Sequence, residues 1–530
     1  MSDTRLVIQL ERLGDLVQTL PALKLLAGES ARTRFAVQQP LHDWAAKLVP
    51  PDVEPVAASS DHLSALLDAL AHGAREQHLA PAAKKLADSL GSERPAFVVN
   101  LTWHAAGAAL ASAYDEQRVV GPIISGTERL NPQFWAAYPI AAVDARPFGR
   151  VHMSDVRRFL VEQALGGARS DPPEPTPEPT DERGDVVLIV GAGDRRRFWP
   201  AERWGQLAAA LGAAGRRVRL AGGPAEHERG EQVAQVARLL GAPAENLCGA
   251  LGPDQLVLVL QQAALVVGAD TGPTHLACWL ARPVVMLMAG RAHVWETGPR
   301  EPGNVAVQAL PVGNAAMSAI PLELVREIAM ARLSGRPPSR PAGPRAPYTA
   351  APHAGSCQVY RSAKSDPRCG LDGVVYEGHG ADDDETAASR ALIALLAGVA
   401  GRRPDESFAS ACLARCLARD PGLAEASSRA HDLATTGGGQ ARKAAQALAA
   451  GEPRRAVETL RSASASVEQL AEALVAHRIT IPLGACLRVA LEHLPAASPE
   501  RVVDELASLF ERAGRATALV ARAASAPSTA

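Results

Sequence analysis

The sequence predicts an α/β protein with two Rossmann-like, doubly wound domains, followed by an all-α C-terminal domain. Over the first 333 residues, short apolar runs alternate with helical patterns, which is typical of parallel sheets with crossover helices. From about residue 386 the pattern is helical nearly to the end and rich in Ala, Leu, Arg and Glu. Two proline-rich stretches separate these parts, so three blocks are expected.

The prolines set the expected domain boundaries. Residues 171–183 and 334–356 should be extended linkers, because proline fits neither a helix interior nor a central strand. The blocks between them are 1–170, 184–333 and 357–530. We expect the first two to be Rossmann-like domains and the third a helical domain of unassigned role.

The elements follow in order along the chain. In the first block, 6–10 reads as a buried strand, a helix runs from about 15 to 26, and 96–100 is a further strand. The second block has expected strands at 186–190, 217–220, 264–267 and 283–287, with helices at 202–213, 226–240 and 253–262. In the third block, 444–460 resembles a tetratricopeptide-like hairpin, with a plain helical bundle as the alternative.

Composition excludes several classes of protein. With 530 residues, 47% of them hydrophobic, the chain is too long for one ordinary core and too apolar to be disordered throughout. A net charge of -2 argues against a general nucleic-acid binder, and seven cysteines are too few for a disulfide scaffold. We see no signal peptide and no run of about 18 uncharged apolar residues, so we expect a cytoplasmic protein. A peripheral position at the inner face of the membrane is compatible with this.

The first polar turn is Arg12-Leu13-Gly14-Asp15, between a strand and a helix. Ligands of doubly wound sheets bind beyond the carboxyl ends of the strands, so Asp15 should face a cleft and could act as a general base. Gly14 permits the tight turn. The alternative is that Asp15 only caps the helix.

Two further polar turns follow strands of the second block. Gly191-Ala192-Gly193 leads into three arginines, among them Arg197, which could bind phosphate; a solvated basic loop is the alternative. The second turn, at 268–275, leads into the start of a helix, whose free N–H groups could bind an anion. In the alternative interpretation, Thr271 only caps that helix and His275 is a core residue. The candidate residues of this turn are Asp270, Thr271, Gly272 and His275.

Other polar patterns carry less chemistry. Asp382-Asp383-Asp384 contains an Asp-x-Asp pattern known from metal-dependent transferases, but its place before a helix favours capping. Cys357 and Cys369 alone make a poor metal site. We therefore expect no metal and no cofactor.

The motifs together resemble glycosyltransferase family 9, the bacterial heptosyltransferases, over about residues 5–333. The opening 6–23, Leu-Val-Ile-Gln-Leu-Glu-Arg-Leu-Gly-Asp-Leu-Val-Gln-Thr-Leu-Pro-Ala-Leu, is similar to the start of that family. The family's donor region resembles 264–277, Ala-Leu-Val-Val-Gly-Ala-Asp-Thr-Gly-Pro-Thr-His-Leu-Ala. Further matches in order and spacing are Trp199–Trp204, Ala221–Glu226, Asn246–Gly249 and Arg282-Pro283.

The resemblance implies a GT-B fold and inverting, metal-independent transfer from an ADP-heptose-like donor to a lipopolysaccharide core. It places Asp15 as the base, Arg197 at a phosphate-binding lysine and Glu226 near the nucleoside. It assigns the donor diphosphate to the loop 270–275. It also makes residues 1–170 the acceptor-side domain and residues 184–333 the nucleotide-sugar-binding domain. The chain departs from the family at Ile189-Val190, where His-Pro is common, and at Gly193, where a polar residue is common.

Two other functions stay open at this point. A related transferase could use another nucleotide sugar to build a surface polysaccharide. A non-catalytic nucleotide-sugar-binding scaffold could instead use the helical tail to recruit a protein partner. The expected partners of the leading interpretation are the nucleotide-sugar donor and a lipid-linked glycan acceptor.

Overall fold

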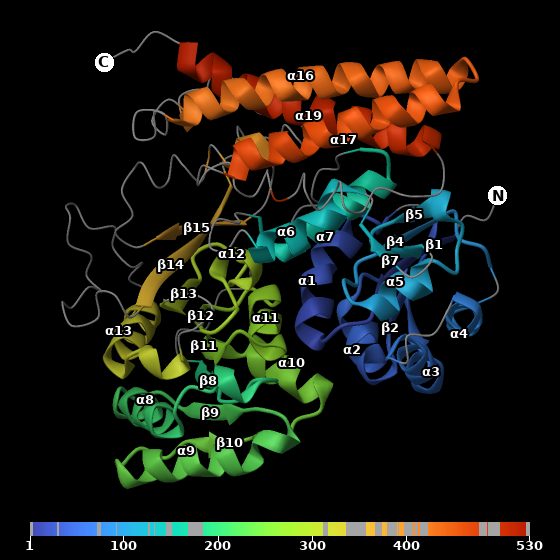
Figure 1. Cartoon of the computed structure of the whole chain (residues 1–530). Coiled ribbons are helices and arrows are strands. Elements are labelled where there is room, and N and C mark those ends of the chain that lie inside the picture. Colours follow the sequence, from blue (N-terminus) through green and yellow to red (C-terminus); the bar gives the residue numbers. More distant parts are fainter. Residues whose placement is uncertain are drawn as a thin grey trace.

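The structure is a computed structural model of the whole chain (Figure 1). It describes residues 4–28, 31–71, 76–91, 93–125, 128–131, 133–144, 151–167, 184–310, 316–334, 357–365, 374–378, 422–475 and 499–525, with 390, 392–396, 405, 409, 412–413 and 485. Both proline-rich linkers, the Asp382–Asp384 run and Cys369 lie outside these residues.

The first sheet is parallel, with strand order β3-β2-β1-β4-β5. Its strands are β1 (Thr4–Gln9), β2 (Arg32–Gln38), β3 (Val53–Ala58), β4 (Phe97–Asn100) and β5 (Val119–Val120). Strand β1 is central, and its Leu6, Val7 and Ile8 are buried on both faces, as expected for an apolar run in a parallel sheet. The strand order reverses between β1 and β4.

Helices and a hairpin complete the first α/β unit. They are α1 (Leu13–Lys24), α2 (His42–Leu48), α3 (Ser60–Ala71), α4 (Glu76–Ser89), α5 (Ala105–Ala111), α6 (Phe134–Asp144) and α7 (Met153–Ala164), with β6 (Ile123–Ser125) and β7 (Glu128–Leu130). Helix α7 packs against α1, which brings residues near 157 to the start of α1.

The second sheet has the strand order β10-β9-β8-β11-β12-β13-β14-β15. Its parallel strands are β8 (Asp185–Ile189), β9 (Val218–Ala221), β10 (Glu245–Asn246), β11 (Ala263–Ala269), β12 (Val284–Met288) and β13 (Val305–Ala309). The helices of this unit are α8 (Ala201–Ala213), α9 (His227–Leu239), α10 (Pro253–Gln261), α11 (Gly272–Trp279), α12 (Val294–Thr297) and α13 (Leu322–Leu333). This order is that of a doubly wound fold, with its reversal between β8 and β11.

Two strands depart from the expected helical third block. β14 (Cys357–Lys364) pairs antiparallel with β13, and β15 (Val374–Gly378) pairs antiparallel with β14. Residues 357–364 and 374–378 therefore extend the second sheet, which corrects the all-helical expectation for them. The physical reason is that β13 would otherwise present an unpaired edge, and β14 satisfies its backbone groups.

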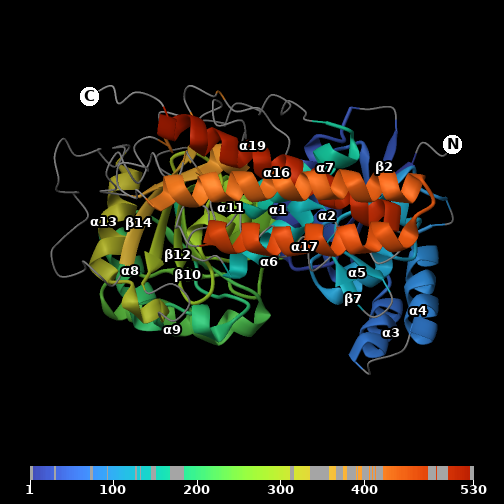
Figure 2. The same ribbon diagram turned by 45° about the horizontal axis from the view of Figure 1, so that its top comes forward.

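The rest of the described tail is helical, as predicted. Helices α16 (Gly422–Ala449), α17 (Pro453–Val475) and α19 (Pro499–Ser525) pack as a bundle. The turn expected near 450 is present, with Gly451 at a φ of 73° between α16 and α17. Figures 1 and 2 both show the bundle lying across α6 and α7, and apolar residues of the two regions form one core cluster.

The two α/β units touch along α1 and α11 (Figure 1). The ammonium of Lys24 lies 4.2 Å from the ring centre of Trp279. Lys47 forms an ion pair with Asp254 across the same boundary. Because α1 and α11 each begin where their sheet reverses its strand order, this contact brings the two candidate turns together.

Candidate functional site

The starts of α1 and α11 face each other at close range. A Cβ on Gly14 would lie 3.3 Å from Cδ2 of His275, and a Cβ on Gly272 would lie 3.0 Å from Cβ of Leu13. Glycine at both positions lets the two helix starts approach. Polar turns that are about 250 residues apart in sequence thus form one region, at the strand ends where doubly wound sheets bind ligands.

Asp15 is the third residue of α1 and is partly exposed, with 32% of its side chain accessible. One carboxylate oxygen accepts a weak hydrogen bond from the backbone N–H of Arg12 at 3.4 Å. The other lies 2.8 Å from Nη2 of Arg157 on α7. The residue at the N-cap position is Arg12, so the alternative of Asp15 as the N-cap residue is corrected to a contact from inside the first turn.

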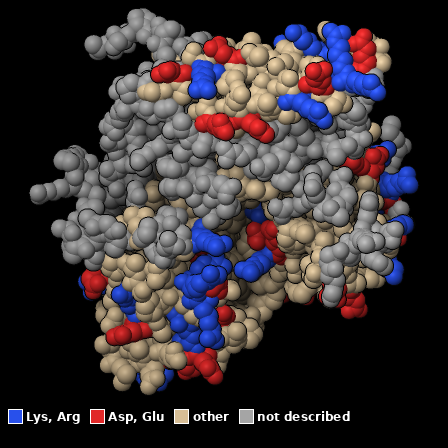
Figure 3. Space-filling view, viewed as in Figure 1, with Lys and Arg blue, Asp and Glu red and all other residues tan. Residues whose placement is uncertain are grey.

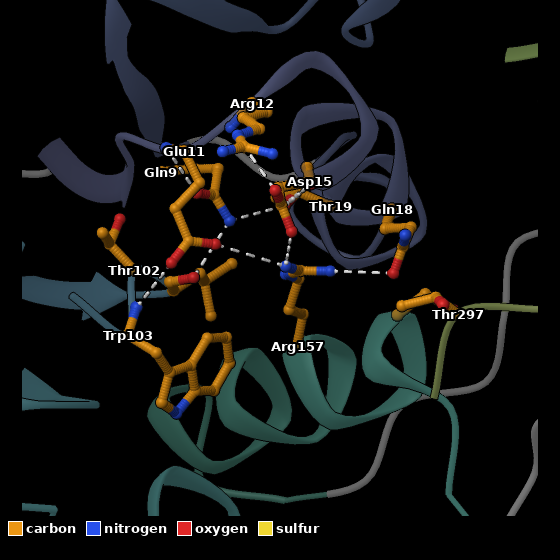
Figure 4. Close-up of polar contacts among 12 residues, drawn as sticks. Gln9, Glu11, Arg12, Asp15, Gln18, Thr19, Thr102, Trp103, Arg157 and Thr297 are labelled. Atoms are coloured by element: carbon orange, nitrogen blue, oxygen red, sulfur yellow. Dashed lines mark hydrogen bonds and ion pairs between the residues drawn. The ribbon is translucent and has the colours of Figure 1, made fainter. Parts of the chain in front are cut away.

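A second carboxylate lies beside Asp15 (Figure 4). Glu11 accepts the backbone N–H of Trp103 at 3.0 Å and lies 3.8 Å from Nη2 of Arg157, the same nitrogen that contacts Asp15. Burial, and then the charge of Asp15, raise the pKa of Glu11 to about 7, although Arg157 and the Trp103 N–H oppose the shift. We call Glu11 and Asp15 the carboxylate pair.

Arg157 links the carboxylate pair to the second unit. Its side chain is 1% exposed, and Nη1 donates to Oε1 of Gln18 at 3.2 Å. Nε2 of Gln18 lies 3.2 Å from Nε2 of His275, which in turn lies 2.9 Å from Oδ1 of Asp270. An ionised carboxylate can only accept a hydrogen bond, so Nε2 of His275 donates to Asp270. The side-chain nitrogen of Gln18 lies next to this hydrogen bond.

Asp270 is buried and ionised. Burial alone would raise its pKa, but the hydrogen bond and charge of His275, the charge of Arg197 and the Thr297 hydroxyl together lower it. Nη1 of Arg197 donates to the backbone oxygen of Asp270 at 2.6 Å and lies 3.3 Å from its Oδ2. Asp270 thus holds Arg197 and His275 at the start of α11.

The other residues of this loop divide by role. Thr271 is the N-cap residue of α11, but its side chain makes no capping hydrogen bond. His275 is 6% exposed, so it is buried as the core interpretation expected and also hydrogen-bonded to Asp270. Of the three arginines, Arg196 pairs with Asp194 at 2.7 Å and lowers the pKa of Asp194 to about 2. The side chain of Arg197, unlike that of Arg196, contacts Asp270 just before the start of α11.

The glycine-rich turn after β8 lies next to the loop that follows β9. A Cβ on Gly191 would fall 2.3 Å from Cγ of Glu226, so only glycine allows this approach. Glu226 accepts the backbone N–H of Gly223 at 2.7 Å. A Cβ on Gly193 would lie 3.6 Å from Nη1 of Arg12, which brings a cation of the first unit over this turn. Ala192 instead buries its side chain in the core of the second unit, so only its backbone is available to a ligand.

Sequence reasoning missed four residues of this region. Glu11 directly precedes the Arg12–Asp15 turn, and a carboxylate between a strand and a helix is a signal that the sequence does carry. Gln18 occupies a helix position that gives no such signal. Arg157 and Thr297, which donates to Asp270 at 3.3 Å, come from distant segments without a motif.

The surface above these residues is hollowed. Figure 3 shows a depression between the two α/β lobes, with Lys and Arg atoms and acidic atoms gathered along it. Arg12, Arg195 and Arg196 are exposed on the turns after β1 and β8. Within the described parts of the chain, no three His, Cys, Asp or Glu side chains cluster in a way that could hold a metal ion. No helix among the described residues is both long and apolar enough to cross a membrane.

Comparison with known proteins locates the similarity. The model of glycosyltransferase family 9 (heptosyltransferase) matches residues 162–314. Lipopolysaccharide heptosyltransferase 1 of Escherichia coli strain K12 is 30% identical over 129 residues, which are 24% of this chain and 36% of that protein. The protein of that name from E. coli O18:K1:H7 is also 30% identical over 129 residues. The chain therefore spans about a third of the length of the curated relatives it matches.

The solved structures that match this chain have low sequence identity to it. A glycosyltransferase family 9 structure from Veillonella parvula is 18% identical, covers 63% of this chain and 98% of that one, and has a TM-score of 0.47. A heptosyltransferase of E. coli solved with ADP is 21% identical, covers 62% and 99%, and has a TM-score of 0.45. The strand order of the two sheets establishes the α/β fold class independently of them. The match of the family model at residues 162–314 confirms the resemblance to glycosyltransferase family 9.

Proposed function

We propose that the protein is an inverting glycosyltransferase that moves a heptose-like sugar from a nucleotide diphosphate to a lipopolysaccharide core or related surface glycan. The observation that carries the proposal is the meeting of Asp15 with the Asp270–His275 loop, through Arg157 and Gln18. A base on one unit and an anion-binding helix start on the other are the two parts that such a transfer needs.

The mechanism follows from these parts. Inversion is a single displacement, so one base suffices: Asp15 takes the proton of the acceptor hydroxyl as its oxygen bonds to the anomeric carbon. The bond from that carbon to the diphosphate breaks at the same time, and negative charge grows on the leaving phosphate. Arg197 and the first N–H groups of α11 stabilise that charge, and Gly191, Gly193 and Glu226 hold the rest of the nucleotide. Protein cations and dipoles replace a divalent metal in this scheme.

The proposal also assigns a role to each part of the chain. Residues 1–170 form the acceptor side and 184–333 the donor side, and the bundle of α16, α17 and α19 in the tail can recruit a protein partner. The protein acts in the cytoplasm, at the inner face of the membrane where a lipid-linked acceptor is presented. An ADP-activated sugar is the donor in this proposal, as the resemblance to the heptosyltransferases implies.

A non-catalytic scaffold that binds a nucleotide sugar is the second candidate. It is favoured because the chain lacks the histidine that the family commonly carries at the end of the first strand of the donor domain. Ile189 and Val190 stand where His-Pro is common, and both are 2% exposed, buried in the apolar core. A scaffold would bind the nucleotide sugar without turning it over.

A thermal-shift screen against ADP, UDP and GDP, each with and without its sugar, tests donor binding. A ligand at 100 times its Kd stabilises the bound state by about 2.7 kcal/mol, which is readily seen as a raised Tm. We expect stabilisation by ADP and its sugar alone. Selective stabilisation by UDP or GDP would favour another nucleotide sugar, and no stabilisation by any of them would refute the donor site.

A further inference from the structure

We propose that Glu11 is the second proton acceptor of the reaction: it takes from Asp15 the proton that Asp15 removes from the acceptor hydroxyl. The inference rests on the proposed function and adds to it a residue that the single-base mechanism does not use. Glu11 contacts Asp15 directly and the reacting hydroxyl only through it.

The geometry provides the path. Two neighbouring carboxyl groups can pass a proton between them, and Glu11 lies next to Asp15 with both side chains against Nη2 of Arg157. Arg157 lies 2.8 Å from Asp15 and 3.8 Å from Glu11, so the ionic form of the pair is better stabilised on Asp15. Asp15 is the more exposed member and meets the substrate, and Glu11 is the more buried member behind it, with its pKa raised by that burial (Figure 4).

Three separate elements contribute groups that surround Glu11. Asp15 comes from α1, Arg157 from α7, and the Trp103 N–H from the loop after β4. His104, on the same loop, has its Nε2 3.2 Å from the backbone oxygen of Leu10, the residue before Glu11. The guanidinium of Arg157 also lies 5.7 Å from the ring centre of Trp103. This aromatic contact helps to hold the cation next to the two carboxylates.

The proton transfers balance as follows. With both carboxylates ionised, the acceptor O–H bond breaks toward Asp15, the acceptor oxygen bonds to the anomeric carbon, and the bonding electrons of the cleaved C–O bond leave with the diphosphate. The proton then moves from Asp15 to Glu11, and water removes it from Glu11 to restore the pair. When Glu11 is already protonated it cannot receive this proton. Turnover should therefore rise with pH as Glu11 ionises.

The experiment compares the pH dependence of kcat and of the donor KM in the full-length wild type and in Glu11→Gln. Glutamine keeps an oxygen for the Trp103 N–H and an amide for Asp15, but it cannot accept a proton. Glu472→Gln, an exposed position on α17, is the matched control. In the wild type and the control, kcat should rise with a midpoint near pH 7, as the raised pKa of Glu11 requires. In Glu11→Gln the step should vanish, and kcat above pH 8 should fall at least about 10-fold with little change in KM.

The outcomes separate a failure of the Glu11 role from a failure of the proposed function. An active wild type whose pH step survives in Glu11→Gln would overturn the role of Glu11 and leave the proposed function standing. An inactive wild type with every nucleotide sugar would instead refute the proposed function.

A second measurement does not need Glu11→Gln to fold. Carboxyl ¹³C NMR of glutamate-labelled protein should show one glutamate that titrates near pH 7, and in Asp15→Asn this signal should move to lower pH, because the charge of Asp15 raises the pKa of Glu11. An unshifted signal, or none near pH 7, would contradict the carboxylate pair.

Discussion

Replacing Glu11 with Gln should stabilise the folded protein relative to wild type at alkaline pH, and much less at acidic pH. The pKa of Glu11 is raised from 4.5 to about 7, mainly by burial and then by the charge of Asp15. A carboxyl whose folded pKa lies above its unfolded pKa binds its proton more tightly in the folded state. The ionisation of Glu11 therefore does not destabilise the folded state below about pH 4.5. The free-energy penalty of ionisation grows as the pH rises and levels off above about pH 7.

The size of the effect follows from the shift. One pKa unit corresponds to about 1.4 kcal/mol, so the ionised Glu11 costs the folded state about 3 kcal/mol at most. The side chain is 20% exposed, so screening by solvent reduces this figure only in part. Most of the cost should appear between pH 5 and pH 8, which corresponds to a Tm difference of several degrees for a unit of about 150–250 residues.

Differential scanning calorimetry at pH 5, 6, 7 and 8 measures this difference, with Glu472→Gln as the control. The Tm of Glu11→Gln minus that of wild type should increase with pH and level off near pH 8, while the control should show a flat line. A difference that stays constant from pH 5 to pH 8 would show that Glu11 ionises at an ordinary pKa, and the carboxylate-pair reasoning would be wrong.

Three further predictions concern the donor side, the tail and metals. Arg197→Ala should weaken ADP binding more than adenosine binding, and Thr271→Ala should do so less strongly, as titration calorimetry can measure; equal losses for both ligands would make the Arg197 effect structural. A chain ending at 334 should lose several degrees of Tm relative to one ending at 378, because it uncovers the edge of β13, and equal Tm values would show that β14 contributes nothing. Excess EDTA should leave transfer rates unchanged, and activity lost to EDTA but restored by a divalent cation would refute the metal-independent scheme.

Much of the α/β arrangement could be predicted because apolar runs in a parallel sheet are nearly continuous. The run at 186–190 corresponds to β8 (Asp185–Ile189), and the run at 264–267 lies inside β11 (Ala263–Ala269). β2 (Arg32–Gln38) escaped the pattern because it begins with two arginines within three residues, one exposed and one half-buried. β14 escaped it because its pairing with β13 is a long-range contact across the second linker. The division into domains at the proline-rich linkers remains a prediction.

The site could be predicted only where sequence neighbours share one turn. Gly14 and Asp15, or Asp270 and Thr271, lie together because a strand-to-helix turn places them so. Arg157 is 142 residues from Asp15, and only the packing of α7 on α1 brings them together. The raised pKa of Glu11 has the same origin, since burial, its largest cause, is a property of the folded chain and leaves no mark on the sequence.

The measurement that tests the central claim most directly is transfer by Asp15→Asn. Asparagine keeps the volume and an oxygen for the Arg12 N–H, so the start of α1 should persist, but it cannot take a proton. ADP released from ADP-heptose in the presence of a lipopolysaccharide core acceptor should be readily detected with wild type, and should fall about 100-fold or more with Asp15→Asn. ADP should bind both proteins equally. Near-normal release by a folded Asp15→Asn would contradict the account, because Asp15 would then serve only the helix start.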